Sequence, residues 1–255
     1  MKATTFFILI FLPVLVLAET IRETRELTLS ADGVDTLVIN CGAGSFHLRG
    51  SDDRMDIKVA AQIEVEDFEA AKFQRFFQNH VQLVLEKRER QAILQSDIKP
   101  AALATLEARI NLTIEVPKKL NTKITDGSGP IFVGGLNSNL TVYDGSGSIE
   151  IKDIIGEVRV DDFSGSIVIA DIEGNVLVID RSGSIDIEYI SGDVQVKDGT
   201  GSITIGAVDG NVSVSDSSGS IDIQSIKKDV FIVISEGGSG DVTVEGVKGK
   251  VTIRP

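Results

Sequence analysis

The chain is 255 residues long and acidic, with 25 lysines and arginines against 38 aspartates and glutamates, a formal net charge of −13. This excess of negative charge would repel phosphate backbones and anionic lipid headgroups, which excludes nucleic-acid binding from the expected functions. The single cysteine excludes an internal disulfide framework, and the two histidines leave little material for a histidine-based metal site or a serine triad.

Residues 1–18 have the pattern of a secretory signal peptide. Lys2 supplies a positive start, and residues 6–17 form an apolar run that leads to a small-residue cleavage site at Ala18. We therefore expect an exported chain that is periplasmic, displayed on the cell surface or secreted. No later segment approaches the length of a spanning helix, so no membrane insertion is expected after cleavage.

Residues 19–120 are expected to form degenerate coils and a capping region. An alternating apolar segment leads into Cys-Gly-Ala-Gly-Ser-Phe at 41–46, which matches the later repeats with Cys41 at their aspartate position. Counting by twos places Cys41 inward, as a buried structural thiol, and His47 outward. A nucleophilic Cys–His pair needs both groups on one side, so none is expected here.

Residues 66–80 interrupt the strand pattern. Phenylalanine and alanine side chains recur there at helical spacing after an acidic first turn, which predicts one amphipathic helix between early strands. Because terminal repeats of a solenoid need a cap, we expect this helix to cover an open end or side. Strand alternation returns at 81–85 and 110–116, whereas residues 86–108 show no clear pattern.

Residues 121–255 repeat one pattern with a period of eighteen residues. Each regular copy contains an aspartate, a glycine three residues later, a Ser-Ile pair and, after a second glycine, a Val-x-Val pair. The aspartates are Asp126, Asp144, Asp162, Asp180, Asp198 and Asp216. A short, fixed period of this kind indicates a solenoid, in which no single repeat can bury its own apolar face.

The alternation within each copy indicates two buried strand runs joined by two corners. Ile149 and Ile151 alternate with polar residues, and Val158 and Val160 form a second run after Gly156. A copy of this length is too short for a strand–helix–strand unit, so successive copies must stack as parallel strands. We predict an all-β fold, a parallel β-solenoid of about seven coils and about 34 Å in length.

These features together resemble the “putative adhesin” family of bacterial β-strand-repeat proteins. The likeness covers most of the mature chain. It rests on the export signal, the early Cys-Gly-Ala-Gly-Ser-Phe segment, the helical interruption and the Asp-x-Ser-Gly-Ser-Ile repeats. It implies an exported, right-handed β-solenoid built from a domain of unknown function, and it implies no catalytic residues. The word adhesin is a label by analogy.

The aspartate ladder is the most regular chemical feature of the sequence. Its parity places each carboxylate inward at a corner, where neighbours about 4.8 Å apart would repel by roughly 3 kcal/mol at a dielectric of about 20. Either the turn backbone donates hydrogen bonds to each carboxylate, or cations lie between them. The candidate ligands of the calcium alternative are Asp144, Asp162, Asp180, Asp198 and Asp216.

No coil stands apart from the others as a catalytic site. Carboxylates recur in every copy, and the coils lack the long loops on which polysaccharide-cleaving β-helices hold their sites. The sequence favours a protein that is not an enzyme, needs no cofactor, and acts as an adhesin-like or structural interaction module of the cell envelope. The alternatives are a calcium-binding β-roll-like module and a carbohydrate-acting β-helix enzyme.

The expected ligand is a protein or glycan of the cell envelope. Outward positions are mostly polar, but four apolar residues with outward or corner positions form a candidate interaction patch: Phe163, Val168, Leu177 and Ile179. The final coil stops at Pro255 with no aromatic or helical cap. Its unpaired strand edges predict a monomer with weak end-to-end self-association.

Overall fold

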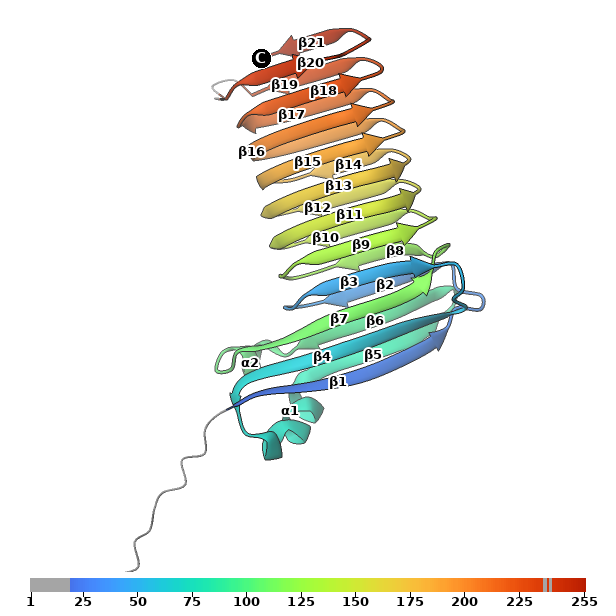
Figure 1. Ribbon diagram of the computed structural model, residues 1–255. Coiled ribbons are helices and arrows are strands. Elements are labelled where there is room, and N and C mark those ends of the chain that lie inside the picture. Colours follow the sequence, from blue (N-terminus) through green and yellow to red (C-terminus); the bar gives the residue numbers. More distant parts are fainter. Residues whose placement is uncertain (1–18, 236–237, 239) are drawn as a thin grey trace, which may run out of the picture.

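The protein is a tall column of stacked strands in a computed structural model that describes residues 19–235, 238 and 240–255 (Figure 1). The predicted signal peptide, residues 1–18, lies outside the described residues. None of the helices in the described part of the chain is long and apolar enough to cross a membrane.

Strands on two faces enclose a single core. The first face consists, in spatial order, of β5 (Val81–Arg88), β6 (Gln91–Ile98), β2 (Thr36–Cys41), β8 (Asn121–Thr125), β10 (Leu140–Asp144), β12 (Val158–Asp162), β14 (Val176–Ile179), the first part of β16 (Val194–Val208), β17 (Val212–Ser218), β19 (Val230–Ile234) and β21 (Val251–Arg254).

The second face lies on the other side of the core. It consists of β1 (Glu19–Ser30), β4 (Asp56–Phe68), β7 (Ala108–Pro117), β3 (Phe46–Ser51), β9 (Ile131–Leu136), β11 (Gly147–Ile155), β13 (Gly165–Glu173), β15 (Ser182–Ile190), the second part of β16, β18 (Ile221–Ile226) and β20 (Val242–Glu245). From β6 and β7 upward, all pairings are parallel.

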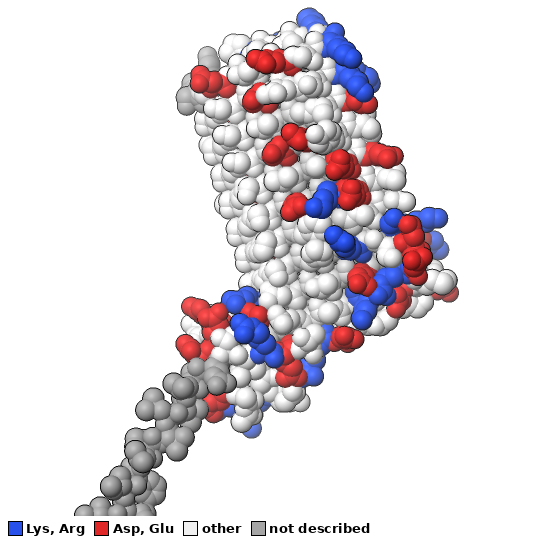
Figure 2. Space-filling view, viewed as in Figure 1, with Lys and Arg blue, Asp and Glu red and all other residues white. Residues whose placement is uncertain are grey.

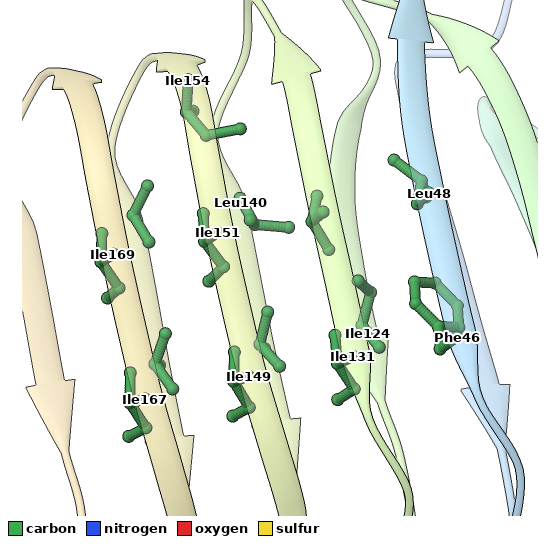
Figure 3. Close-up of a cluster of buried hydrophobic side chains, with 14 of the residues drawn as sticks. Phe46, Leu48, Ile124, Ile131, Leu140, Ile149, Ile151, Ile154, Ile167 and Ile169 are labelled. Carbon is green, nitrogen blue, oxygen red and sulfur yellow. The ribbon is translucent and has the colours of Figure 1, made fainter. Parts of the chain in front are cut away.

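The register of the regular coils follows the sequence period. Ile149 lies beside Ile131 in one neighbouring coil and beside Ile167 in the other, so identical side chains form continuous rows. Figure 3 shows this row, which Phe46 of β3 extends toward the N-terminal end. These side chains are buried, and branched residues suit such stacked strands. The predicted parallel β-solenoid with eighteen-residue coils is confirmed.

The second corner of each coil, which joins a second-face strand to the next first-face strand, contains a residue in the left-handed backbone region. These residues are Asp153, Asp171, Tyr189, Ala207 and Ser225, with φ between 52° and 60°. The left-handed residue breaks the inward–outward alternation by one position, which turns Ile154 into the core and directs Ile155 toward solvent.

The N-terminal region joins the column through contacts distant in sequence. β2 and β3 form a coil directly beneath β8 and β9, although residues 52–120 intervene in the chain. Those residues supply the next layer: β6 and β7 pair in parallel with β2 and β3, and the antiparallel strands β5, β4 and β1 complete the end.

The helix predicted over residues 66–80 is shorter than expected. β4 continues to Phe68, because the Glu66 N–H donates a 2.9 Å hydrogen bond to the Glu107 carbonyl and keeps this segment in the sheet. A 3-10 turn at Ala70–Lys72 then leads into α1 (Phe73–His80). A second, one-turn helix, α2 (Pro100–Leu103), lies in the stretch that had no clear pattern.

Candidate functional site

The six aspartates of the repeat form one internal column at the first corner, the turn that joins a first-face strand to the next second-face strand. Asp144 lies beside Asp162 in the parallel register, and Asp198 lies beside Asp216. All six are buried, with Asp162 and Asp216 only 2% exposed. The predicted inward placement of the ladder is confirmed, and its carboxyls are shielded from solvent.

Backbone amides of the turn satisfy one oxygen of most of these carboxylates. The donors are Gly145 N–H to Asp144 Oδ1 (2.8 Å), Ser164 N–H to Asp162 Oδ1 (3.3 Å), Ser182 N–H to Asp180 Oδ1 (3.2 Å) and Ser218 N–H to Asp216 Oδ1 (3.2 Å). The Oδ2 atoms of Asp126, Asp144, Asp162 and Asp180, and both oxygens of Asp198, are buried without a partner. Hydrogen bonds from the turn backbone therefore account for only one oxygen of most of these carboxylates.

The same burial shifts the pKa values of these carboxyls. Burial raises the pKa of all six carboxyls, and at Asp162 and Asp198 the charges of the neighbouring aspartates raise it further, to about 6. At Asp126 burial, with a contribution from the charge of Asp144, raises the pKa to about 7. Protonation of such carboxyls as the pH falls toward these pKa values relieves the repulsion within the column.

The calcium candidates lie in one column but not in a cluster. Across the residues that the structure describes, no three histidine, cysteine, aspartate or glutamate side chains gather in a way that could hold a metal ion. Each coil contributes one inward carboxylate to the ladder, and Ca²⁺ requires six to eight oxygen ligands. The ladder by itself does not provide that coordination.

Cys41 occupies the foot of this column, as its alignment with the aspartates predicts. It is partly buried, not fully buried as expected. Its Sγ lies 3.7 Å from the Thr125 carbonyl oxygen. Burial, reinforced by the charge of Asp126, raises the pKa of the thiol far above its usual range. The thiol therefore stays protonated and is a poor nucleophile.

His47 points outward from β3, on the side that the parity predicts. Its ring stacks on Phe132 with centroids 4.4 Å apart. Burial against this ring lowers the pKa of the imidazole, and the charge of Arg49 lowers it further. His47 is therefore the exposed side of an aromatic stack and has no nucleophile to activate.

The four residues of the predicted interaction patch do not share one face. Val168 projects from β13 on the second face, whereas Leu177 and Ile179 project from β14 on the first face and are only partly exposed. Phe163 lies at the first corner, where the Arg181 guanidinium covers its ring at 4.7 Å. Consecutive strands are joined by a corner and lie on opposite faces of the column. Outward-pointing residues of two consecutive strands therefore point in opposite directions.

A groove of about 750 Å³ follows the second corner instead. Five successive coils line it, each with its left-handed residue. Tyr189 and Ile155 are its exposed apolar residues, with Tyr189 59% exposed. Its charged lining is mainly acidic, with Asp153, Asp171, Glu173 and Asp209 against Lys118 and Lys227. The sequence carries one signal of this site, a tyrosine at a corner position that in the other coils is glycine, aspartate, alanine or serine.

The relationship of this chain to known proteins is shown by a family profile. The sequence profile of the Toastrack DUF4097 family matches residues 34–252, which is most of the chain. The chain belongs to the Toastrack DUF4097 family. The resemblance seen in the sequence is thereby confirmed, and the function of this family is unknown. A comparison with curated proteins gives no match.

Solved structures similar to this Toastrack DUF4097 protein share little sequence identity with it. A “putative adhesin” from Bacteroides fragilis is 14% identical, with a TM-score of 0.47 over 92% of this chain and 97% of that one. A “putative cell adhesion protein” from Clostridium sporogenes is 15% identical, with a TM-score of 0.37 over 91% and 99%. A “putative lipid binding protein” from Parabacteroides distasonis is 16% identical, with a TM-score of 0.37 over 91% and 96%.

Proposed function

We propose that this protein is an exported, non-enzymatic interaction module of the bacterial cell envelope that binds a glycan chain along its second-corner groove. The observation that carries the proposal is the exposed Tyr189 ring in an acidic groove that runs across five coils. A solenoid presents such extended surfaces because each coil adds one equivalent position.

The chemistry of the groove suits a carbohydrate. A tyrosine ring offers a flat apolar surface with a polar tip, on which the C–H face of a sugar ring can pack. The carboxylate side chains of Asp171 and Glu173 offer hydrogen-bond acceptors, and sugar hydroxyls are donors. A polyanionic ligand would be repelled by the same carboxylates, so a neutral or amino-bearing glycan is the expected class.

The column keeps these positions in a fixed relation. At the second corner, side-chain oxygens of one coil accept hydrogen bonds from backbone N–H groups of the next coil. The Glu157 N–H donates to Asn139 Oδ1 at 2.9 Å, and at an equivalent turn the Asn211 N–H donates to Asp193 Oδ1 at 2.7 Å. Such bonds between coils resist twisting of one coil against another. A pre-organised surface of this kind loses little conformational entropy on binding.

A pair of matched variants tests the proposal. Tyr189→Ala removes the ring in the groove, and Phe163→Ala removes a comparably exposed ring (56%) at the opposite corner. Binding to a glycan array and to insoluble envelope polysaccharide should fall about tenfold for Tyr189→Ala and stay unchanged for Phe163→Ala. Equal losses for both variants, or no binding by the unaltered protein, would contradict it. Release of reducing ends from a bound oligosaccharide would contradict the non-enzymatic part.

A further inference from the structure

Among the described residues, no strand covers the core at the C-terminal end of the column. β20 pairs with β18 and β21 pairs with β19, so the outer backbone groups of both strands lack a ladder partner among the described residues. Val251 and Ile253 occupy the inward positions that the buried Val230 and Ile232 hold one coil below. They are nevertheless 41% and 49% exposed, because none of the coils that the structure describes is stacked on them.

The two uncovered strands have opposite charge. β20 follows Asp241 and ends at Glu245, whereas β21 follows Lys250 and ends at Arg254, and all four side chains are exposed. In Figure 2 basic side chains gather at one margin of this end. One edge of the open end is therefore acidic and the other is basic.

The N-terminal end of the column is covered. α1 lies against it, with Phe73 and Phe76 buried (Figure 1). The Arg25 guanidinium of the edge strand β1 lies 5.0 Å from the Phe77 ring centroid and also donates a hydrogen bond to Gln74. Because α1 lies against this end, a head-to-tail stack of copies would meet the helix, whereas the C-terminal end presents exposed core side chains.

We propose that two copies of this chain associate through their C-terminal ends, related by a twofold axis parallel to the strands. This rotation places β21 of each protomer over β20 of the other. Because the chain reverses direction between β20 and β21, both new pairs are antiparallel. The contact covers Val251 and Ile253 in both protomers and sets each basic edge against an acidic one.

Charge decides between this axis and the other possible twofold arrangement. An axis perpendicular to the strands would place β20 on β20 and β21 on β21. Asp241 and Glu245 would then oppose like charges, and so would Lys250 and Arg254, which destabilises an antiparallel pair. Each edge strand is short, so the dimer depends on protein concentration. This inference is independent of the groove and its glycan.

Sedimentation velocity of the purified protein over a concentration series tests the association. The double variants Asp241→Lys/Glu245→Lys and Lys250→Glu/Arg254→Glu should each raise the dimer dissociation constant about tenfold, because every charge pair becomes like-charged. An equimolar mixture of the two variants should restore the dimer. Circular dichroism confirms that each variant is folded. A protein that stays monomeric throughout, or double variants that dimerise as tightly as the unaltered chain, would overturn the proposal.

A cross-linking experiment tests the axis. In a Cys41→Ser background, Thr243→Cys lies on the outer side of β20 and Thr252→Cys lies on the outer side of β21. Mixing the two variants should yield a disulfide-linked heterodimer faster than either variant links to itself. Faster self-linking of each variant would show the perpendicular axis and overturn the proposed one.

Discussion

Asp162 lies beside Asp144 in the parallel register, and both side chains are buried inside the column, so the charge of one carboxyl affects the pKa of the other. Burial and then the charges of Asp144 and Asp180 raise the pKa of Asp162 to about 6. Backbone amides hold one oxygen of most members of the ladder, and the raised pKa values mean that its charge repulsion is relieved by protonation as the pH falls.

The first prediction concerns pH. The folded pKa of each ladder carboxyl is raised above its unfolded value of 3.8, so the folded state binds more protons between the two values. The free energy of unfolding should therefore increase as pH falls from about 7 toward about 4. We expect a higher melting temperature at pH 5 than at pH 8, measured by circular dichroism at constant ionic strength. A melting temperature that falls steadily as the pH is lowered from 8 to 5 would contradict the buried ladder.

A different carboxylate, Glu64, limits how far stability should increase as the pH falls. Burial raises the pKa of Glu64, but hydrogen bonds from Arg22 and Arg109 outweigh it, and the net pKa lies below its usual range. A lowered folded pKa contributes stability that is lost as pH falls through it. Stability should therefore pass through a maximum at mildly acidic pH and decline below it.

The second prediction isolates one member of the ladder. Both oxygens of Asp198 are buried without a partner, and burial with the charges of Asp180 and Asp216 raises its pKa to about 6. Asp198→Asn removes the charge and adds a donor that can reach a neighbouring carboxylate. We expect about 1–3 kcal/mol of stabilisation at pH 8 and a smaller effect at pH 5, from denaturant titrations.

The control for this variant is Asp186→Asn, which removes a charge of the same kind from an exposed outward position of β15. It should change the free energy of unfolding by less than about 0.5 kcal/mol at both pH values. Equal effects of the two substitutions would show that net charge, and not the ladder, is responsible.

The third prediction concerns the glycine that lies near the start of the second-face strands. Gly183 has a φ of +151°, and a Cβ added there would lie 1.6 Å from the Gly165 carbonyl oxygen of the coil below. Gly183→Ala should cost more than about 3 kcal/mol, since the backbones of two coils must separate. Glu188→Ala, at an outward position of the same strand, should be nearly neutral in thermal melting. Similar losses for both would contradict the register.

The fourth prediction concerns the left-handed residues of the second corner. Ala207 has a φ of 52°, a conformation that costs a residue with a Cβ about 1–2 kcal/mol relative to glycine. Ala207→Gly should therefore stabilise the protein by up to about 1 kcal/mol despite the added freedom of the unfolded chain. Ala170→Gly, in an ordinary strand position of β13, should destabilise it by about 0.5–1 kcal/mol. A loss of stability in both variants would contradict the strain at the corner.

The repeat by itself determined the coil. An eighteen-residue period with two alternating runs dictates parallel stacking, and parity alone places Asp162 inward and His47 outward, because inward and outward positions alternate along a strand. The isoleucine rows and the aspartate column both follow from equal coil lengths. The likeness of residues 41–46 to the repeats likewise indicated a coil there.

Tertiary contacts decided the rest, since they join segments whose pairing has no local signature. β2 lies beside β8 across residues 52–120, and β4 holds Phe68 in a strand where the helical spacing of its neighbours predicted α1 to begin. Only the path of the chain around the corner shows that Val168 and Leu177 lie on opposite faces of the column. The groove around Tyr189 and the uncovered core at Ile253 arise from stacking, which periodicity describes within a coil but not at the surfaces and ends of the column.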